Sequence, residues 1–248
     1  MFAFIIYWKY TDSMELYAEL ERRLVSGRGR TVISVTGGGG KTTLLRLFGR
    51  YLSRRGYSVL ITTTTKIQSP DTFDYGVKKA FTEYREIRDY EVEPSDFVFY
   101  AERHPSLPKM IAPKIGALED ISKRFDVTLI EADGSRHLPL KIHTERDPVI
   151  LPGTNAFIGI FNTSCIGRKA GDVTFGLEGD MRHVDTDFLK WYFNTGEGAL
   201  KGWNRKDPGV MIFNGADDVA VPEGLLDFDR DIEVIVASEE RNEIYSVL

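Results

Sequence analysis

Apolar residues recur along this chain with two different periods. Continuous apolar or β-branched runs at Thr31–Val35 and Tyr57–Thr63 are typical of strands that are buried on both faces. Between them, apolar residues at helical spacing run from Leu44 to Leu52, and Gly56 marks the end of that helix. A strand, a helix and a strand in close succession form a βαβ unit, so this pattern predicts a parallel sheet.

The same periods predict further elements on both sides of this unit. Before it, apolar residues from Leu16 to Leu24 share one helical face, and Asp12 and Glu15 have the spacing of a capping box. The pattern as a whole predicts an α/β fold of three layers with a mainly parallel sheet. The further expected strands are Phe97–Ala101, Val127–Glu131, Ala156–Ile160, Val210–Phe213 and Ile232–Ala237, and the further expected helices are Ile115–Arg124 and Asp185–Phe193.

These patterns divide the chain into two parts. We expect residues 1–30 to form an N-terminal extension and helix, and residues 31–248 to form a single α/β domain. Residues 163–209 are rich in Gly and Asp with weak periodicity, so we expect a loop-rich insertion there, either a functional loop or a small subdomain. The apolar run Phe2–Trp8 lacks the flanks of a signal peptide and is either a packed strand or a stretch upstream of a start at Met14.

Charge and cysteine content exclude several classes of protein. The 248 residues carry a formal net charge of −5, whereas a general nucleic-acid binder would be basic. No segment reaches the roughly 20 apolar residues that a membrane-spanning helix needs, so we expect no membrane insertion. Cys165 is the only cysteine, which excludes an internal disulfide and indicates a cytoplasmic protein.

Four consecutive glycines separate the first strand from its helix. Glycines allow backbone N–H groups to turn towards an anion, and the helix N-terminus adds partial positive charge. In such a nucleotide-binding loop Lys41 would contact the terminal phosphates, and the Thr42 hydroxyl would bind Mg²⁺. The common pattern G-x-x-x-x-G-K-[ST] would require a glycine at the position of Val35, so this loop is two residues shorter than that pattern. A shorter loop of this kind also resembles the phosphate loop of Mur-type peptide ligases. The candidate nucleotide-binding residues of the loop are Gly37, Gly38, Gly39, Gly40, Lys41, Thr42 and Thr43.

Two carboxylates end the strand that begins at Val127. Glu131 and Asp133 are two residues apart, so both side chains can lie on one face of the strand. A phosphate loop needs an acidic group of this kind for its Mg²⁺ shell. We expect Asp133 and Thr42 to bind Mg²⁺, Glu131 to orient water or an acceptor, and Lys41 to neutralise charge as the phosphoryl group moves. The two acids could exchange these roles.

Two further segments offer weaker candidates near the phosphates. Thr64 and Lys66 follow the second strand, where a hydroxyl could contact Mg²⁺ or phosphate and an ammonium could contact phosphate. Threonine also favours strands for reasons unrelated to ligands. His137 and His143 follow the acidic strand end, and they either lie near the phosphates or are ordinary hydrogen-bonded histidines.

The sequence N-G-A-D from Asn214 to Asp217 follows a predicted strand and resembles the N-K-x-D of GTPases, in which the Asp accepts hydrogen bonds from guanine. Gly215 stands in place of the Lys, so the aliphatic stem that covers the base is missing. Val236–Ser238, at the end of the last strand, faintly resembles the further base-contacting S-A-K loop. These are also ordinary turn residues. Asn214 and Asp217 are therefore candidates for base binding, and ATP and GTP both stay open.

Several of these segments together resemble one family. Val32–Thr43, Val59–Ile67, and Leu129–Lys141 followed by Asp147–Ile150 are similar to the YqeC-type proteins, which are described as accessory proteins of selenium-dependent molybdenum hydroxylases. The resemblance covers about half of the chain. It implies a P-loop NTPase-like fold and a part in maturing a molybdenum hydroxylase, through its cofactor or selenium. Lys141 is a candidate only because it matches the family's acidic-strand segment.

These observations predict a P-loop protein that binds a Mg²⁺–nucleoside triphosphate at Gly37–Thr43 and hydrolyses it in such an accessory role. Two alternatives stay open. A small-molecule kinase or a Mur-like ligase would need an acceptor pocket beyond the sheet. A nucleotide-gated binding or delivery protein would show slow or absent turnover.

Overall fold

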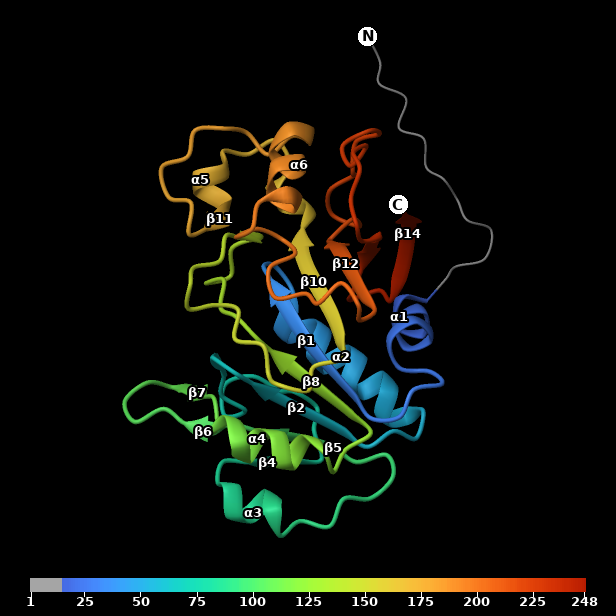
Figure 1. Ribbon diagram of the computed structural model, residues 1–248, viewed down its shortest axis with the longest axis vertical. Coiled ribbons are helices and arrows are strands. Elements are labelled where there is room, and N and C mark those ends of the chain that lie inside the picture. The colour runs from blue at the N-terminus through green and yellow to red at the C-terminus, as the bar shows by residue number, and fades with distance from the viewer. Residues whose placement is uncertain (1–14) are drawn as a thin grey trace.

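The computed structural model describes residues 15–248 (Figure 1). The apolar run Phe2–Trp8 and the expected cap at Asp12 therefore lie outside the described residues. The core of the fold is a nine-stranded sheet. Its strands are β1 (Thr31–Gly37), β2 (Val59–Thr63), β4 (Lys79–Phe81), β5 (Phe97–Tyr100), β8 (Val127–Glu131), β10 (Ala156–Asn162), β12 (Gly209–Asn214), β13 (Val234–Ser238) and β14 (Glu243–Val247).

The strands of this sheet lie in the order β14-β13-β12-β10-β1-β8-β2-β5-β4. All neighbouring strands run parallel except the edge strand β14, which runs antiparallel to β13. The strand that leads into the glycine cluster is therefore central, with β8 on one side and β10 on the other. The short strands outside this sheet are β3 (Lys66–Gln68), β6 (Glu102–Arg103), β7 (Lys109–Ile111), β9 (Leu140–Lys141) and β11 (Thr174–Phe175).

Helices cover both faces of the sheet. One face packs against the apolar sides of α1 and α2, and the opposite face packs against α3 and α4 near β4 and against α5 and α6 near β13. Figure 1 shows α3 and α6 at opposite ends of the molecule. The predicted three-layer α/β fold with a mainly parallel sheet is confirmed. The helices are α1 (Leu16–Leu24), α2 (Lys41–Arg54), α3 (Tyr84–Arg88), α4 (Ile115–Ser122), α5 (Ala170–Val173) and α6 (Thr186–Asn194).

Some boundaries differ from the sequence prediction for identifiable reasons. β1 continues beyond Val35 to Gly37 because Thr36 and Gly37 still pair with β10. α1 begins directly after Glu15, whose extended backbone places it at the N-cap and not at the third helical position that a capping box with Asp12 requires. The segment 163–209 contains a short 3-10 helix, α5, β11 and α6, and its β11 pairs with β9 in the loop that follows β8. None of the helices within residues 15–248 combines the length and the apolar character needed to span a bilayer.

Candidate functional site

Parallel strands bring the carboxyl ends of β1, β8, β10, β12 and β13 to one edge of the sheet. Ligands of open α/β sheets bind at this edge, outside the carboxyl ends of the strands. In this protein polar residues and glycines gather there. They are the glycine cluster after β1, Glu131 and Asp133 after β8, Asn162 at the end of β10, Asn214 at the end of β12 and Glu239 after β13.

The glycine cluster forms a tight turn between β1 and α2. Gly37, Gly39 and Gly40 have φ angles of 102°, 71° and 139°, which side chains of other residues rarely allow. Within residues 15–248, no hydrogen bond engages the N–H groups of Gly39 and Gly40. The first-turn N–H groups of α2, which begins at Lys41, likewise have no partner inside the helix. The turn therefore offers a run of unpaired donors to an anion.

The first two glycines of the cluster have N–H groups that are already engaged. The Gly37 N–H donates to Asp133 Oδ2 at 2.9 Å, and the Gly38 N–H donates to the Ile160 carbonyl of β10 at 2.8 Å. A Cβ on Gly38 would lie 2.4 Å from the Leu138 carbonyl oxygen, so only glycine fits there. The N–H groups of Gly37 and Gly38 thus have acceptors within the protein itself. Gly37 and Gly38 shape the turn, and the donors left for an anion begin at Gly39.

Thr42 and Glu131 contact each other beside this turn. The register of β1 and β8 places Val35 opposite Glu131, and the Thr42 hydroxyl donates to Glu131 Oε2 at 3.0 Å. Glu131 is 7% exposed. Burial raises its pKa to about 7, although Lys41 and the Thr42 hydroxyl both favour the ionised form. A hydroxyl and a carboxylate are oxygen ligands of the kind that Mg²⁺ prefers.

Asp133 has a different environment from Glu131, although only one residue separates them. Its side chain is fully buried, and its Oδ2 accepts hydrogen bonds from the Gly37 N–H at 2.9 Å and from His143 Nε2 at 2.7 Å. Burial by itself would raise its pKa, but Lys41 and His143 outweigh burial and hold the pKa at about 2. The structure therefore brings Thr42 to Glu131, whereas the sequence prediction paired Thr42 with Asp133 as Mg²⁺ ligands.

The Lys41 side chain folds back over the turn. Its Nζ donates to the Gly37 carbonyl and lies 3.1 Å from Asp133 Oδ1, and the residue is 4% exposed. The contact with Asp133 Oδ1 is an ion pair without hydrogen-bond geometry, since that oxygen has no hydrogen-bond partner within the described residues. A phosphate at the turn would compete with these two contacts for Lys41.

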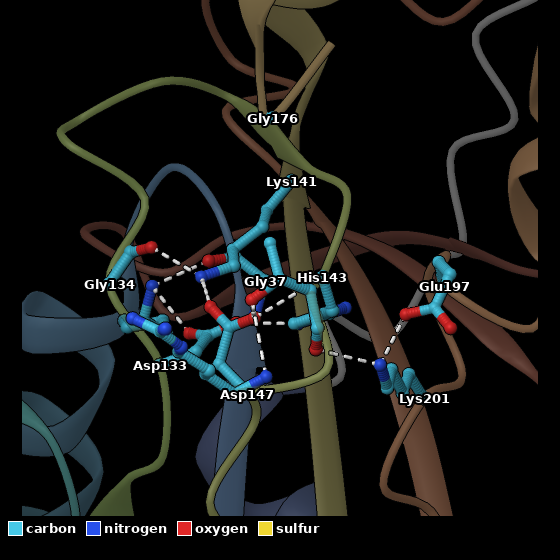
Figure 2. A network of polar contacts seen from close by, with 12 residues as sticks. Gly37, Asp133, Gly134, Lys141, His143, Asp147, Gly176, Glu197 and Lys201 are labelled. Carbon is cyan, nitrogen blue, oxygen red and sulfur yellow. Dashed lines mark hydrogen bonds and ion pairs between the residues drawn. The ribbon is translucent and has the colours of Figure 1, made fainter.

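His143 connects the acid Asp133 beside the glycine turn to a distant segment (Figure 2). Its Nε2 contacts Asp133, and its Nδ1 lies 3.1 Å from the Gly198 carbonyl, so both ring nitrogens face acceptors. Lys201 Nζ extends this network by donating to the Thr144 carbonyl at 2.8 Å and pairing with Glu197. The sequence suggested His143 only as one of two histidines that follow the acidic strand, because Gly198 lies far away along the chain.

Lys141 is 1% exposed, and its ammonium contacts the loop that follows β8 (Figure 2). Its Nζ donates to the Gly134 carbonyl at 2.6 Å and forms an ion pair with Asp147, so it fixes the loop that follows β8. The Thr64 hydroxyl likewise donates to a carbonyl, that of Val149. Lys66, at the start of β3, is exposed.

Polar side chains from β10, β12 and β13 border the other side of the turn. Asn214 Nδ2 donates to the Gly39 carbonyl at 3.3 Å, and Asn214 Oδ1 accepts from the Glu239 N–H at 3.0 Å. Asp217 is 3.2 Å from Arg241 Nε in an ion pair. Asn162 packs on Gly39, because a Cβ added to Gly39 would lie 2.5 Å from the Cβ of Asn162. Sequence reasoning missed Asn162 and Glu239; the one available signal was that each of them ends or follows an apolar strand.

Thr42 and Glu131 can hold a metal ion when a bound molecule supplies the remaining metal ligands. Within residues 15–248, no group of three or more His, Cys, Asp or Glu side chains is placed to bind a metal ion. Thr42 and Glu131 alone do not complete a Mg²⁺ shell, and Mg²⁺ at nucleotide sites takes its remaining ligands from phosphates and water. The geometry thus fits a cation that arrives with a phosphate group.

Comparisons with known proteins identify a family. The family model described as YqeC protein matches residues 33–178. The "Uncharacterized protein YqeC" of Escherichia coli (strain K12) is 34% identical over 142 residues, which are 56% of this chain and 54% of that protein. The chain therefore spans about half the length of the curated relative it matches. No solved structure matches the chain. Because the family model covers more than half of its residues, the chain belongs to the YqeC family.

Proposed function

We propose that this protein binds a Mg²⁺–nucleoside triphosphate at Gly37–Thr43 and hydrolyses it. The observation that carries the proposal is the contact between Thr42 and Glu131 beside the unpaired N–H groups of the glycine turn. Donors for phosphate and oxygen ligands for Mg²⁺ then lie side by side at the carboxyl edge of the sheet. A turn with a purely structural role would need neither the buried lysine nor the buried acid.

Each residue of the turn has a separate task in this proposal. The N–H groups of Gly39–Thr43 bind the phosphates, and Lys41 leaves Asp133 to contact the terminal phosphate. Thr42 and Glu131 would hold Mg²⁺, which when bound neutralises charge on the phosphate oxygens. Asp133 Oδ1 then loses its ion pair with Lys41 and can accept a hydrogen bond from the attacking water.

His143 supports this arrangement as a positioning residue. It shares Asp133 Oδ2 with the Gly37 N–H, so it fixes the carboxylate while leaving Oδ1 towards Lys41. Two donors on one oxygen restrict the rotation of the Asp133 side chain. The free oxygen then keeps one direction while Lys41 moves.

The family resemblance supports a cellular context for this activity. We propose that hydrolysis serves the maturation of a selenium-dependent molybdenum hydroxylase in the cytoplasm, through the cofactor or the selenium of that enzyme. Deleting the gene in its own organism should lower the activity of the hydroxylase without lowering the amount of its polypeptide. An unchanged activity would remove this context and leave the nucleotide chemistry untouched.

Calorimetric titration with Mg²⁺-ATP and Mg²⁺-GTP tests the site itself. We expect Lys41→Ala to abolish binding, and Thr42→Val to weaken binding in Mg²⁺ but much less in EDTA. Lys190→Ala, at an exposed position of α6, is the control and should bind as the wild type does. Binding that survives Lys41→Ala unchanged would refute the site.

Turnover assays separate the remaining alternatives. Release of inorganic phosphate supports hydrolysis. A phosphorylated small molecule would instead indicate a kinase or a ligase, and binding without turnover would indicate a nucleotide-gated delivery protein. In all three cases Glu131→Gln should remove the Mg²⁺ dependence, because Gln cannot supply an ionised oxygen to the metal.

A further inference from the structure

Glu239 is a buried carboxylate beside the glycine turn. The residue is 5% exposed, and its Oε2 has no hydrogen-bond partner in the part of the chain that the structure describes. Its carboxylate lies against Gly40, where an added Cβ would stand 2.7 Å from Oε1 and 2.9 Å from Oε2. Burying a carboxylate oxygen without a donor destabilises a folded protein. A ligand that brings donors to this place would remove that cost.

The other polar side chains at this end of the sheet already have partners. Asn214 uses its amide nitrogen on the Gly39 carbonyl and its oxygen on the Glu239 N–H. Asp217 forms an ion pair with Arg241. The Glu239 carbonyl accepts from the Tyr17 hydroxyl, which fixes the backbone there. On the β12–β13 side of the turn, Glu239 Oε2 is therefore the buried acceptor that a ligand would find unoccupied.

The order of the strands separates Glu239 from the Mg²⁺ side of the turn. β8, which carries Glu131, lies on one side of β1, whereas β10, β12 and β13 follow on the other side. If the terminal phosphate and Mg²⁺ lie at Glu131 and Thr42, the rest of the nucleotide extends towards β12 and β13. A carboxylate there would repel further phosphates, but it fits the hydrogen-bond donors of a nucleoside.

We propose that Glu239 recognises guanine by accepting hydrogen bonds from the N1–H and N2–H groups of the base on its two carboxylate oxygens. This inference rests on the proposed function and names GTP as the nucleotide. An ionised carboxylate offers two acceptors and no donor. Guanine presents two adjacent donors on the matching edge, whereas adenine presents one donor beside one acceptor, so adenine leaves one oxygen unsatisfied.

The electrostatic state of Glu239 agrees with a missing donor at Oε2. Its pKa is raised to about 8, because burial and the nearby Glu240 outweigh the hydrogen bond from the Asn214 side chain and the charge of Arg46. Two N–H donors from a bound base would favour the ionised form and lower this pKa. Binding of guanine therefore takes up no proton at this site and releases one where the free protein is protonated.

Four probes test the inference on the full chain: Mg²⁺-GTP, Mg²⁺-ITP, which lacks the N2 group, Mg²⁺-ATP, and Mg²⁺-tripolyphosphate, which lacks a nucleoside. We expect the wild-type affinities to fall from GTP to ITP to ATP. Glu239→Gln should weaken GTP binding by about ten- to a hundredfold and strengthen ATP binding, because an amide offers the donor and acceptor that adenine needs. Tripolyphosphate binding should stay unchanged, which also shows that the variant is folded.

The matched control is Glu240→Gln, an exposed neighbour that should keep the wild-type preference. An unchanged ratio of GTP to ATP affinity in Glu239→Gln would overturn the inference. So would a loss of affinity confined to 2′,3′-dideoxy nucleotides, which would place the sugar at Glu239. If Glu239→Gln unfolds, Glu239→Asp serves in its place with the same expectation for GTP. Absence of binding for all four probes would overturn the proposed function as well, whereas tripolyphosphate binding without base preference would overturn this inference alone.

Discussion

Replacing Glu131 and Asp133 by their amides should change the stability of the protein in opposite directions. The two acids are neighbours at the end of β8, and both are buried. Within residues 15–248, no Lys, Arg or His side chain hydrogen-bonds Glu131, whose Oε2 instead contacts the Thr42 hydroxyl. Asp133 accepts two hydrogen bonds and pairs with Lys41. We therefore expect Glu131→Gln to stabilise the nucleotide-free protein at pH 8 and Asp133→Asn to destabilise it.

The pKa values set the magnitudes. In the folded protein the pKa of Glu131 is raised from 4.5 to about 7. The wild type therefore loses stability as the pH rises from 4.5 to about 7. This loss amounts to about 3 kcal/mol, which Glu131→Gln should recover at pH 8 and not at pH 4.5. The pKa of Asp133 is lowered from 3.8 to about 2. The ionised Asp133 carboxylate therefore stabilises the folded protein above pH 3.8, and this stabilisation disappears as the pH falls through about 2. Asp133→Asn also leaves Lys41 buried without its counter-charge, for a total loss of about 3–5 kcal/mol.

Urea unfolding of the nucleotide-free protein in EDTA, at pH 8 and at pH 4.5, measures both effects. Asp89→Asn is the control, because Asp89 forms its ion pair with Arg88 at the surface and its removal should leave the midpoint unchanged. Two variants that change stability in the same direction would refute the reasoning. A gain for Glu131→Gln that persists at pH 4.5 would refute it too, since Glu131 is then protonated in the wild type.

Three further predictions address the surroundings of the turn. Gly40→Ala should abolish nucleotide binding, because the φ of Gly40 is 139° and an added Cβ would meet Glu239. The control is Gly116→Ala in α4, which should bind normally in the same titration because the space around an added Cβ is open there. Lys141→Met should lower the free energy of unfolding by about 3–5 kcal/mol, and adding Asp147→Leu should restore part of it, because the double variant leaves no unpaired buried charge. GTP affinity should rise from about pH 6 to about pH 8.5, as Glu131 and Glu239 ionise through pKa values of about 7 and about 8, and Glu239→Gln should show a smaller rise in calorimetry because only Glu131 then titrates.

The glycine turn and the elements around it could be predicted because their signals are local. The strand, the glycines and the helix that begins at Lys41 follow one another without interruption, and each restricts the next. The acids of β8 could be predicted for the same reason, since an apolar strand leads directly into them. What the sequence could not assign was which acid contacts Thr42, because that depends on the β1–β8 register. Nor could it show that β10 takes up the Gly38 N–H, because that contact also depends on strand order.

The remaining residues depend on contacts between distant segments. His143 becomes part of the site only because Asp133 and Gly198 reach its two ring nitrogens, and Gly198 follows α6 far along the chain. Glu239 lies beside Gly40 only because β10, β12 and β13 follow β1 in that order in the sheet. No local period in the sequence encodes this order. The ion pair of Asp217, a candidate for base binding, with Arg241 is a further contact that no local pattern in the sequence indicates.

The two sides of the proposed site also differ in how they relate to the family. Gly37–Thr43, Glu131, Asp133 and His143 all lie within residues 33–178, which the family model matches, whereas Glu239 lies beyond them. Phosphate and Mg²⁺ binding therefore rests on residues from the matched segment alone. Guanine recognition concerns this chain alone. A relative that binds ATP through the same phosphate loop would contradict neither proposal, but one that cannot bind tripolyphosphate would weaken the first.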